Sequence, residues 1–505
     1  MPAAHYEPVI GLEVHCQLET RSKMFSTCAV GIGEPPNTLV DAYTLGLPGT
    51  LPVPNTAAVR HGIALALACG CTIHAQSRFA RKHYFYPDLP KGYQITQSDQ
   101  PYATGGGLEV PGFTGPDGEP KRVPLVRIHF EEDAGKNTHV HGEDHSLVDY
   151  NRAGAPLLEI VSEPAIGSAE EAAAYMRELR TLVRTLGISQ ANMEEGTLRC
   201  DANVSIRPRG STTLGTRCEI KNLNSFRFLA QAITAEIRRQ IDVLDSGGTL
   251  QMATLSYDPD RDRTRVMRTK EDAADYRYMP EPDLPPLQIP AAWIEQVRDR
   301  LPPLPAARRA RYREQGLSED DAVLLAGEPA LGDYLDEVLR TGVPAKKAGS
   351  WVTVELLGKL RADGRGIEDS PVRPQALGEL VEMIEAGEIS GRSAKAIFTT
   401  LYTQTDPAMG PRAIAQRDGH RQVSDTAVIE AAVREILDAN PKQVAQFRAG
   451  KTKVRGFFVG QVMNKTRGQA NPQVVNALLD RLLADPTSDE AGNNASKNTD
   501  EGSEQ

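Results

Sequence analysis

A proline-rich run divides this sequence into two parts of different character. In residues 279–287, four of the nine residues are proline, a density that excludes helix and favours an extended linker. Before the run, the chain is rich in glycine, proline and short alternating stretches, whereas Ala, Leu, Glu, Arg and Lys dominate after it. A chain of 505 residues is too long for a single hydrophobic core. The run therefore predicts a boundary between a sheet-containing part and a helical part.

The first part, residues 1–290, shows strand patterns separated by helical ones. In the helical stretches, apolar residues recur at helical spacing. One such stretch begins with a capping-box pattern, Ser168 with Glu171, and ends at Gly187. This order predicts an α+β domain with a mainly antiparallel sheet. The expected helices cover residues 56–69, 168–186 and 225–244, the expected strands cover residues 10–18, 125–130, 157–161, 201–206 and 218–221, and residues 105–120 are expected to form a hairpin or a loose loop.

The second part is expected to be helical throughout. A first helical domain over residues 291–342 would precede a helical tail domain over residues 343–484. The last stretch, residues 485–505, is polar and acidic without an apolar pattern, so we expect it to be disordered.

Residues 11–18 alternate strictly between apolar and polar side chains. In a strand, this alternation places Glu13 and His15 on one face and an apolar row on the other. The carboxylate and the imidazole would then be close enough to share a cation or a proton. A solvated strand face carries similar residues, so this stretch alone leaves both interpretations open.

Further acidic groups occur in other predicted strands. Glu131, Glu132 and Asp133 are consecutive, and adjacent carboxylates repel unless a cation such as Mg²⁺ neutralises them; a solvated acidic turn is the alternative. Glu159 lies within an aliphatic run, where a carboxylate is costly unless it is paired or bound to metal. Asp201 begins a row of oxygen-bearing residues on one strand face. Acids gathered on one sheet suit a metal that holds nucleotide phosphates for phosphoryl transfer.

The common catalytic signatures are absent. No glycine-rich loop ends in Gly-Lys-Ser/Thr after a strand, and residues 450–452 lack the upstream glycine of a phosphate-binding loop. There is also no Gly-x-Ser-x-Gly or His-Glu-x-x-His motif.

Six longer stretches are distinctive: residues 11–18, 82–94, 149–163, 199–205, 219–225 and 276–287. Together they closely resemble the B-subunit family of the heterotrimeric tRNA-dependent amidotransferases, and the likeness runs from about residue 9 to about residue 483. The resemblance implies that the N-terminal domain is similar to the glutamine synthetase/guanido kinase fold and that the tail is a helical bundle that binds tRNA.

The resemblance also implies a reaction. A partner amidase, which is the A subunit of such enzymes, would release ammonia from glutamine, and a small C subunit would join the two large subunits. The B subunit would use ATP and Mg²⁺ to phosphorylate the side-chain carboxylate of Glu on tRNA(Gln) or Asp on tRNA(Asn). Ammonia would then displace phosphate to give Gln-tRNA(Gln) or Asn-tRNA(Asn). The chain is thus expected to belong to an ATP-dependent carbon–nitrogen ligase that uses glutamine as amide donor.

The family's metal site can be carried onto this sequence residue by residue. His15, Glu132 and Glu159 correspond to ligands of a resident Mg²⁺, and Glu13 and Asp201 to a second, more labile site that fills with nucleotide. A histidine beside carboxylates is unusual for Mg²⁺, so Mn²⁺ is an alternative. The four carboxylates of this set are also the expected catalytic residues.

Basic residues complete the predicted sites. Lys82, Lys91 and Arg152 are candidates for contact with phosphate or substrate. The formal net charge of −10 argues against coating nucleic acid by bulk charge, but a local basic face remains compatible with it. The tRNA contacts expected in the tail are Lys451, Lys453, Arg455, Lys465 and Arg467.

The six cysteines show no framework spacing and are expected to be reduced thiols. Some members of the resembled family carry a four-cysteine zinc knuckle, but only Cys28 remains at that place, so we expect no zinc. No basic stretch followed by an apolar run opens the chain, and its longest apolar run, residues 63–69, is too short to cross a bilayer. A cytoplasmic protein without membrane contact is expected.

Two other functions remain to be weighed. A tRNA-binding adaptor that has lost its chemistry is disfavoured, because the acids of the expected metal site are present. A stand-alone carboxylate–amine ligase that acts without tRNA is disfavoured by the basic helical tail.

Overall fold

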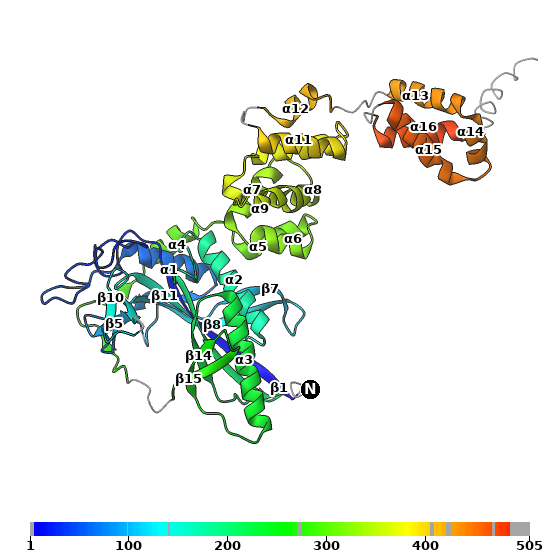
Figure 1. Cartoon of the computed structure of the whole chain (residues 1–505). Coiled ribbons are helices and arrows are strands. Elements are labelled where there is room, and N and C mark those ends of the chain that lie inside the picture. Colours follow the sequence, from blue (N-terminus) through cyan, green and yellow to red (C-terminus); the bar gives the residue numbers. More distant parts are fainter. Residues whose placement is uncertain are drawn as a thin grey trace, which may run out of the picture. The chain divides into compact units, whose positions relative to one another are not determined.

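The computed structural model describes residues 5–97, 99–139, 142–269, 275–404, 409–420, 426–466 and 470–484. The chain divides into two compact units (Figure 1). Unit 1 comprises Met1–Arg311 and Ala322–Pro329, and unit 2 comprises Tyr312–Asp321 and Ala330–Gln505.

Unit 1 is built on a large sheet with β1 (Tyr6–Gln17) in its interior. Within the described residues, ten strands join in the order β15-β14-β13-β12-β1-β11-β8-β6-β2, with β7 paired to β8. Every pair in this sheet is antiparallel except β13 with β14, so the sheet is mixed but close to the predicted type. The other strands are β2 (Thr72–Ile73), β6 (Ala103–Thr104), β7 (Gly107–Thr114), β8 (Pro120–Glu132), β11 (Pro156–Ser162), β12 (Leu198–Pro208), β13 (Cys218–Leu223), β14 (Ala253–Asp258) and β15 (Arg263–Thr269).

Three capped helices pack on this sheet and confirm the helices expected from the sequence. They are α1 (Thr56–Ala68), α2 (Ala169–Thr185) and α3 (Phe226–Asp245). Each begins after a polar residue whose side chain accepts hydrogen bonds from backbone N–H groups of the first turn, which otherwise lack partners. These caps are Asn55, Ser168 and Ser225.

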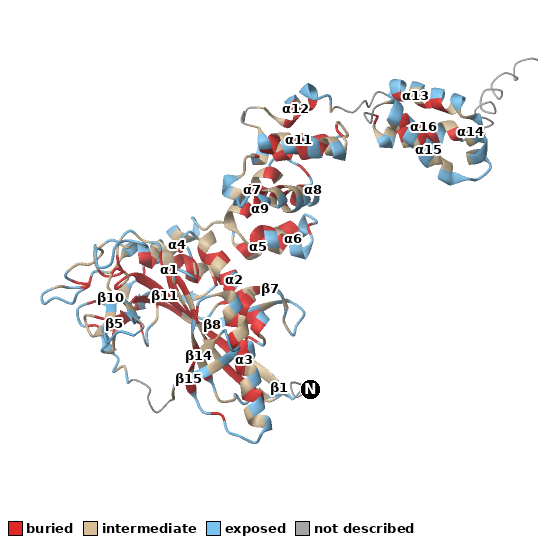
Figure 2. Ribbon diagram, in the orientation of Figure 1, coloured by how far each residue is buried: buried red, intermediate tan, exposed pale blue. Residues whose placement is uncertain are grey.

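The sheet has one apolar face and one polar face, as the alternation of β1 predicts. Leu12, Val14 and Cys16 of β1 are at most 1% exposed and belong to the main hydrophobic core, together with apolar residues of the three helices. The buried strands and helix faces appear red in Figure 2. The polar residues between them, Glu13 and His15, therefore point away from this core.

Short strands add smaller layers to unit 1, and two of them come from the proline-rich run. That run is extended, as predicted, but it is not a free linker: β16 (Met279–Pro280) pairs with β4, and β17 (Leu287–Gln288) pairs with β3. The remaining short strands are β3 (Gln76–Ser77), β4 (Ala80–His83), β5 (Tyr93–Thr96), β9 (Lys136–His139) and β10 (Ser146–Asp149). The predicted hairpin over residues 105–120 is present as β7 and β8.

Buried contacts hold the proline-rich run to unit 1. Arg81 donates hydrogen bonds to both carboxylate oxygens of Glu281, which is only 3% exposed. After the run, Trp293 of α4 (Ala291–Arg298) packs against the main core. Unit 1 consequently continues to Arg311, later than the run itself. The division into a catalytic domain, a helical domain and a tail domain stays a prediction.

The described residues after α4 are helical, as expected. In the last four helices, Val433, Phe458 and Leu479 are fully buried in a separate hydrophobic core. Among the described residues, no helix combines the length and apolar character needed to cross a membrane. Residues 485–505 lie outside the described residues. The helices are α5 (Pro305–Glu314), α6 (Glu319–Ala326), α7 (Pro329–Leu339), α8 (Ala345–Ser350), α9 (Leu357–Ala362), α10 (Pro374–Glu385), α11 (Gly391–Thr403), α12 (Pro411–Arg417), α13 (Thr426–Ala439), α14 (Pro441–Arg448), α15 (Arg455–Lys465) and α16 (Pro472–Leu483).

The contact between α1 and β8 gives a test of the core. A Cβ atom added at Gly62 would lie 2.4 Å from the ring of Phe130, so we expect Gly62→Ala to destabilise the protein by about 1–3 kcal/mol through overpacking. Gly358 in α9 has open space around it, and Gly358→Ala should instead stabilise by about 0.5–1 kcal/mol. Urea denaturation of both variants measures the difference. Equal effects of the two substitutions would contradict the predicted packing.

Candidate active site

The polar face of the sheet carries a row of charged residues that lie opposite one another on four strands. His15 of β1 is paired with Arg199 of β12 on one side and with Glu159 of β11 on the other. Glu159 is in turn paired with His129 of β8. Directly opposite residues of antiparallel strands point to the same face. The register therefore brings together side chains that are far apart in the sequence.

Two carboxylates and two imidazoles meet in this row. His15 Nε2 lies 3.4 Å from Glu131 Oε1 and 3.5 Å from Glu159 Oε2. His129 Nε2 lies 3.4 Å from Glu159 Oε2. The carboxylates of Glu131 and Glu159 are buried, whereas about a fifth of the His15 side chain is exposed. We call His15, His129, Glu131 and Glu159, together with Glu13, the acid–imidazole cluster.

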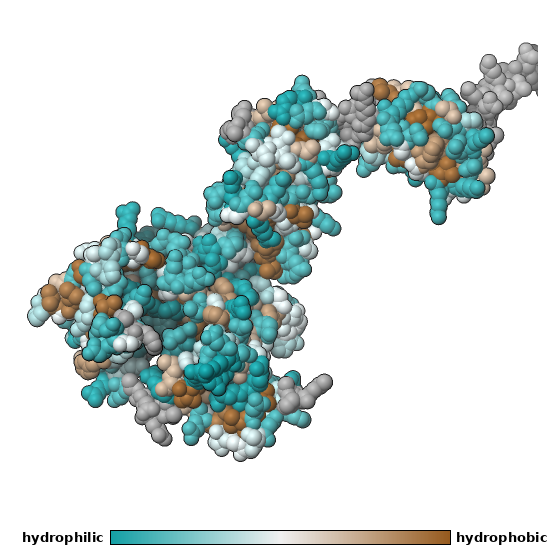
Figure 3. Space-filling model, viewed as in Figure 1, coloured by the Kyte–Doolittle hydropathy of each residue, from teal (hydrophilic) through white to brown (hydrophobic). Residues whose placement is uncertain are grey.

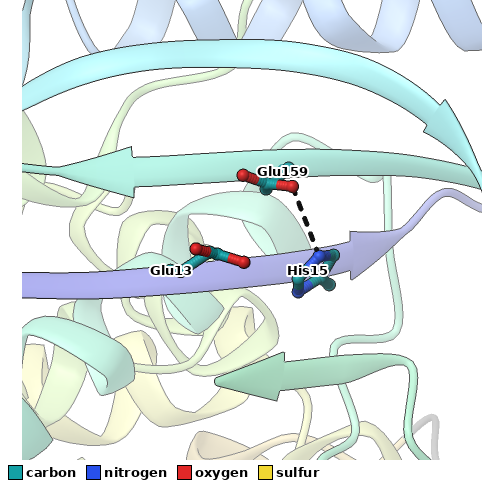
Figure 4. A group of neighbouring side chains, drawn as sticks. All are labelled: Glu13, His15 and Glu159. Atoms are coloured by element: carbon teal, nitrogen blue, oxygen red, sulfur yellow. Dashed lines mark ion pairs between the residues drawn. The ribbon is translucent and has the colours of Figure 1, made fainter. Parts of the chain in front are cut away.

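Glu13 completes the cluster from β1. Figure 4 shows the carboxylate of Glu13 near the carboxylate of Glu159 and the ring of His15. Glu13 and His15 project from β1, and Glu159 projects from the neighbouring strand β11. On its other side, Glu13 is paired in register with Asp201 of β12, whose carboxylate accepts a hydrogen bond of 2.6 Å from Lys221 Nζ.

The pKa values of these groups reflect their mutual charge. Burial acts to raise the pKa of Glu159, but the charge and hydrogen bonding of His129 and His15 hold it well below its usual range. Burial acts to lower the pKa of His15, but its hydrogen bond to Glu159 and the charge of Glu131 raise it to about 9. The pKa of Glu13 is raised by burial and by repulsion from Glu159. The positive charges of His15 and Lys221 thus do not fully offset burial and repulsion at Glu13.

The donor set fits a divalent cation. Two overlapping groups each offer three ligand atoms within 4.8 Å of one another: Glu13, His15 and Glu159, and His129, Glu131 and Glu159. Carboxylate oxygens suit Mg²⁺ and Mn²⁺, and imidazole nitrogen is the better ligand for the transition metal. An added cation would also relieve the repulsion between Glu13 and Glu159.

Glu132 is placed differently from the cluster. Its carboxylate is bonded to Lys91 Nζ and accepts a hydrogen bond of 3.0 Å from the N–H of Ile95. Lys91 also donates to the hydroxyl of Tyr43 at 2.9 Å, and its side chain is only 6% exposed. Two residues predicted for different roles, Glu132 and Lys91, thus form a buried ion pair. Their assignments to metal and phosphate stay predictions.

The other predicted basic residues have distinct surroundings. Arg152 donates to the carbonyl oxygens of Ala134 and Gly135 and lies 3.5 Å from Asp133, so its guanidinium is already engaged. Lys82 Nζ lies 4.8 Å from the ring centroid of Tyr276. Burial acts to lower the pKa of Lys82, but nearby negative charge, that of Glu131 first, raises it. Lys82 is therefore a cation positioned near the cluster.

Sequence reasoning assigned no ligand or substrate role to four residues of this site, Glu131, His129, Arg127 and Arg199, and named Glu131 only as one of three consecutive acids. The signal for the first three was present in the alternation of β8. With Ile128 and Phe130 directed to the core, residues 127, 129 and 131 must face the other way. Arg199 would have followed from its position two residues before Asp201 in the predicted strand.

The basic residues predicted in the tail fall into two kinds. Arg455 lies 2.6 Å from Asp480, and Lys465 is paired with Glu435, so both charges are partly neutralised within the unit. Lys451 and Lys453 are exposed and make no ion pair among the described residues. Arg467 lies outside the described residues.

The fold and the cluster together define a mixed α/β domain with buried charged residues on the polar face of its sheet, followed by helical segments. Residues 8–295 match the model of the GatB/GatE catalytic domain, and residues 333–483 match that of the GatB domain. The chain therefore belongs to the GatB/GatE family.

Curated relatives match nearly the whole chain. The B subunit of the aspartyl/glutamyl-tRNA(Asn/Gln) amidotransferase of Nitrosococcus oceani is 50% identical over 95% of this chain and 100% of its own length. Proteins of the same name from Alkalilimnicola ehrlichii and Geobacter sulfurreducens are 51% and 50% identical, each over 95% of this chain and 99% of the relative.

The ion pair between the buried Asp133 carboxylate and the partly exposed Arg199 guanidinium gives a pH-dependent prediction. Arg199 donates to both Asp133 oxygens, at 2.8 and 3.1 Å. Burial acts to raise the pKa of Asp133, but the charges of Arg199 and Arg152 lower it below the usual 3.8. A lowered folded-state pKa adds stability that is present above pH 3.8 and is lost as the pH falls through the folded-state value.

We therefore expect Asp133→Asn to reduce the free energy of unfolding at pH 7 by about 1–3 kcal/mol, the range for removing one partner of a hydrogen-bonded pair. The deficit should shrink as the pH falls below 3.8. Urea denaturation across this pH range measures it. The matched control is Asp418→Asn, which removes an exposed pair with Arg417 and should leave stability unchanged. A deficit independent of pH would contradict the assigned pKa shift.

Proposed function

We propose that this chain acts as the B subunit of a tRNA-dependent amidotransferase, an ATP-dependent ligase that converts misacylated Glu-tRNA(Gln) or Asp-tRNA(Asn) into the amidated form. The observation that carries the proposal is the similarity to curated B subunits over 95% of the chain, together with the acid–imidazole cluster on the polar face of the sheet. The reaction needs a partner amidase, the A subunit, which supplies ammonia, and a small C subunit that joins the large ones.

The chemistry requires an activated carboxylate. The oxygen of a free carboxylate is a poor leaving group. The side chain of the tRNA-bound Glu or Asp is therefore first phosphorylated by ATP, and ammonia then displaces phosphate. Mg²⁺, or Mn²⁺ in its place, would supply charge neutralisation for the transferred phosphoryl group. We further propose that unit 1 is related to the glutamine synthetase/guanido kinase fold. A mainly antiparallel sheet with acids on its polar face supports this relationship.

The residues of the cluster would divide the work. His15 and Glu159 would hold a resident ion, because their ligand atoms lie 3.5 Å apart, and Glu131, whose carboxylate lies 3.4 Å from His15 Nε2, would lie beside it. Glu13 and Asp201, paired in register on adjacent strands, would hold the ion that arrives with nucleotide. Glu132 would join the first set only if its carboxylate left Lys91. Together these acids are the proposed catalytic residues.

Cations around the cluster would bind the substrate's negative charge. Lys82 of β4 lies within the electrostatic influence of Glu131 and Glu159, and Arg127 Nη2 lies 3.6 Å from Glu159. Their ammonium and guanidinium groups can receive phosphate oxygens in a region otherwise dominated by acids. Lys91 and Arg152 would contribute chiefly by holding Glu132 and the 134–135 backbone in place.

The first functional test removes the central carboxylate. Glu159→Gln keeps the size of the side chain but removes the charge of a proposed metal ligand. We expect phosphorylation of the side chain of tRNA-bound Glu to fall by about two orders of magnitude or more. Loss of a hydrogen-bond partner of a metal ligand already changes metal affinity or activity about 10–100-fold. The measurement is ATP-dependent phosphorylation of Glu-tRNA(Gln) by the assembled enzyme. Glutamine hydrolysis by the partner amidase should continue.

The matched control for this variant is Glu170→Gln, the same change at an exposed position in the first turn of α2. It should leave phosphorylation unchanged. Normal phosphorylation in Glu159→Gln would contradict the assignment of the cluster as the phosphoryl-transfer site.

A second test concerns the tail. Lys451 and Lys453 are the exposed predicted tRNA contacts without an ion pair among the described residues. Replacing both by alanine should weaken tRNA binding and reduce the slope of log affinity against log salt by roughly one to two, because each phosphate contact releases about one counterion. Filter binding at several salt concentrations measures this. Lys346→Ala, at an exposed position of α8, is the control, and an unchanged salt slope in the double variant would contradict the proposed contact.

A further inference from the structure

The loop between β4 and β5 exposes two large aromatic side chains. Phe85 is 88% exposed and Tyr86 is 49% exposed. Leaving the whole ring of a phenylalanine in water costs free energy that burial would recover, so an aromatic pair held outward points to a binding surface. Figure 3 shows that hydrophobic areas are scattered over a mainly hydrophilic surface.

Backbone hydrogen bonds keep this loop in shape. The N–H of Tyr84 donates to the carbonyl of Gly92 at 3.2 Å, and the N–H of Gly92 donates to the carbonyl of Leu89 at 2.9 Å. The hydroxyl of Tyr150 donates to the carbonyl of Pro87 at 2.7 Å. The exposure of the rings is therefore a property of an ordered loop.

Glycine at position 92 lets the Phe85 ring lie against the backbone. A Cβ atom built on Gly92 would come within 3.0 Å of Phe85 Cε1, and the residue has a φ of +75°, which side-chain-bearing residues rarely adopt. One side of the ring thus rests on the loop. Its high exposure means that the remaining surface of the ring is open to a planar partner.

Further aromatic side chains lead from this loop towards the acid–imidazole cluster. The ring of Tyr84 lies 6.4 Å from that of Tyr276, which lies 6.1 Å from that of Tyr278. Lys82 adds a positive charge over Tyr276. The charges of Glu159 and Glu131 act on the phenol of Tyr278, which places this end of the row near the cluster.

Aromatic rings in succession with a cation among them form the usual surface for unpaired nucleotides: bases stack on the rings and phosphates meet the cation. A single ATP adenine would need one enclosed ring face, whereas Phe85 is almost wholly exposed and Tyr86, the next residue, is half exposed. The observations therefore favour a single-stranded RNA end over a mononucleotide.

We propose that Phe85 and Tyr86 form a stacking platform for the unpaired 3′-terminal nucleotides of the aminoacyl-tRNA, and that this platform orients the aminoacyl group towards the acid–imidazole cluster. The inference rests on the proposed function. It assigns Phe85 and Tyr86 as positioning residues, which act on the placement of the RNA end and not on the phosphoryl group itself.

The test compares aromatic and aliphatic residues at position 85 in the assembled enzyme. Phe85→Leu should raise the KM for Glu-tRNA(Gln) roughly tenfold, the size expected from the loss of one base–aromatic stack. The KM for ATP, the kcat at saturating tRNA and glutamine hydrolysis should stay unchanged. Phe85→Trp should restore the KM for tRNA, because it restores a π-face. Leu214→Ala, which shortens another exposed apolar side chain, is the control.

A direct measurement accompanies the kinetics. Glu-tRNA(Gln) with 2-aminopurine at its 3′ end should lose fluorescence on binding to the wild-type enzyme, and less so with Phe85→Leu. A raised KM for ATP alone, failure of the heterotrimer to assemble in gel filtration, or unchanged quenching in Phe85→Leu would overturn the proposal. A wild-type enzyme that quenches the probe but forms no amide would instead overturn the proposed function, so the two failures are distinguishable.

Discussion

The buried carboxylate of Glu159 is the interaction on which the polar face of the sheet depends. An isolated carboxylate within a central strand would cost several kcal/mol of desolvation. Here the imidazoles of His15 and His129 and the guanidinium of Arg127 surround it, and the two imidazoles keep its pKa low against the effect of burial. These partners come from β1 and β8, the two strands that flank β11. The strand register that satisfies Glu159 is therefore the same register that assembles the cluster.

Much of this arrangement follows from the sequence, because a strand has a strict period of two. The alternation in β1 correctly predicted that Glu13 and His15 face one side and the core residues the other. The same rule, applied through the end of β8, separates Glu131 from Glu132. Treating residues 131–133 as one acidic group concealed that separation. The pairing between strands was not predictable, since one sequence fixes which face a residue occupies but not which residue lies opposite.

The boundary between the two parts shows a different limit. Proline density correctly predicted an extended segment, because proline fixes φ and cannot donate a backbone hydrogen bond. Whether such a segment is free or docked depends on tertiary contacts. The Arg81–Glu281 ion pair and the packing of Trp293 hold this one to unit 1. Arg81 and Glu281 lie far apart in the sequence, and nothing in the local composition of either indicates the other.

The distribution of charge determines how an acidic chain can handle tRNA. A net charge of −10 and a carboxylate cluster both repel phosphate at long range. The proposed contacts are accordingly local: exposed lysines in the tail, cations beside the cluster, and stacking, which is insensitive to charge. An aromatic platform on the approach to an acidic site is suited to this situation, because it binds a base without attracting or repelling the backbone that carries it. Divalent ions would neutralise the remaining negative charge only where the carboxylates converge. The RNA end could therefore be bound and positioned before the carboxylate of its amino acid is phosphorylated.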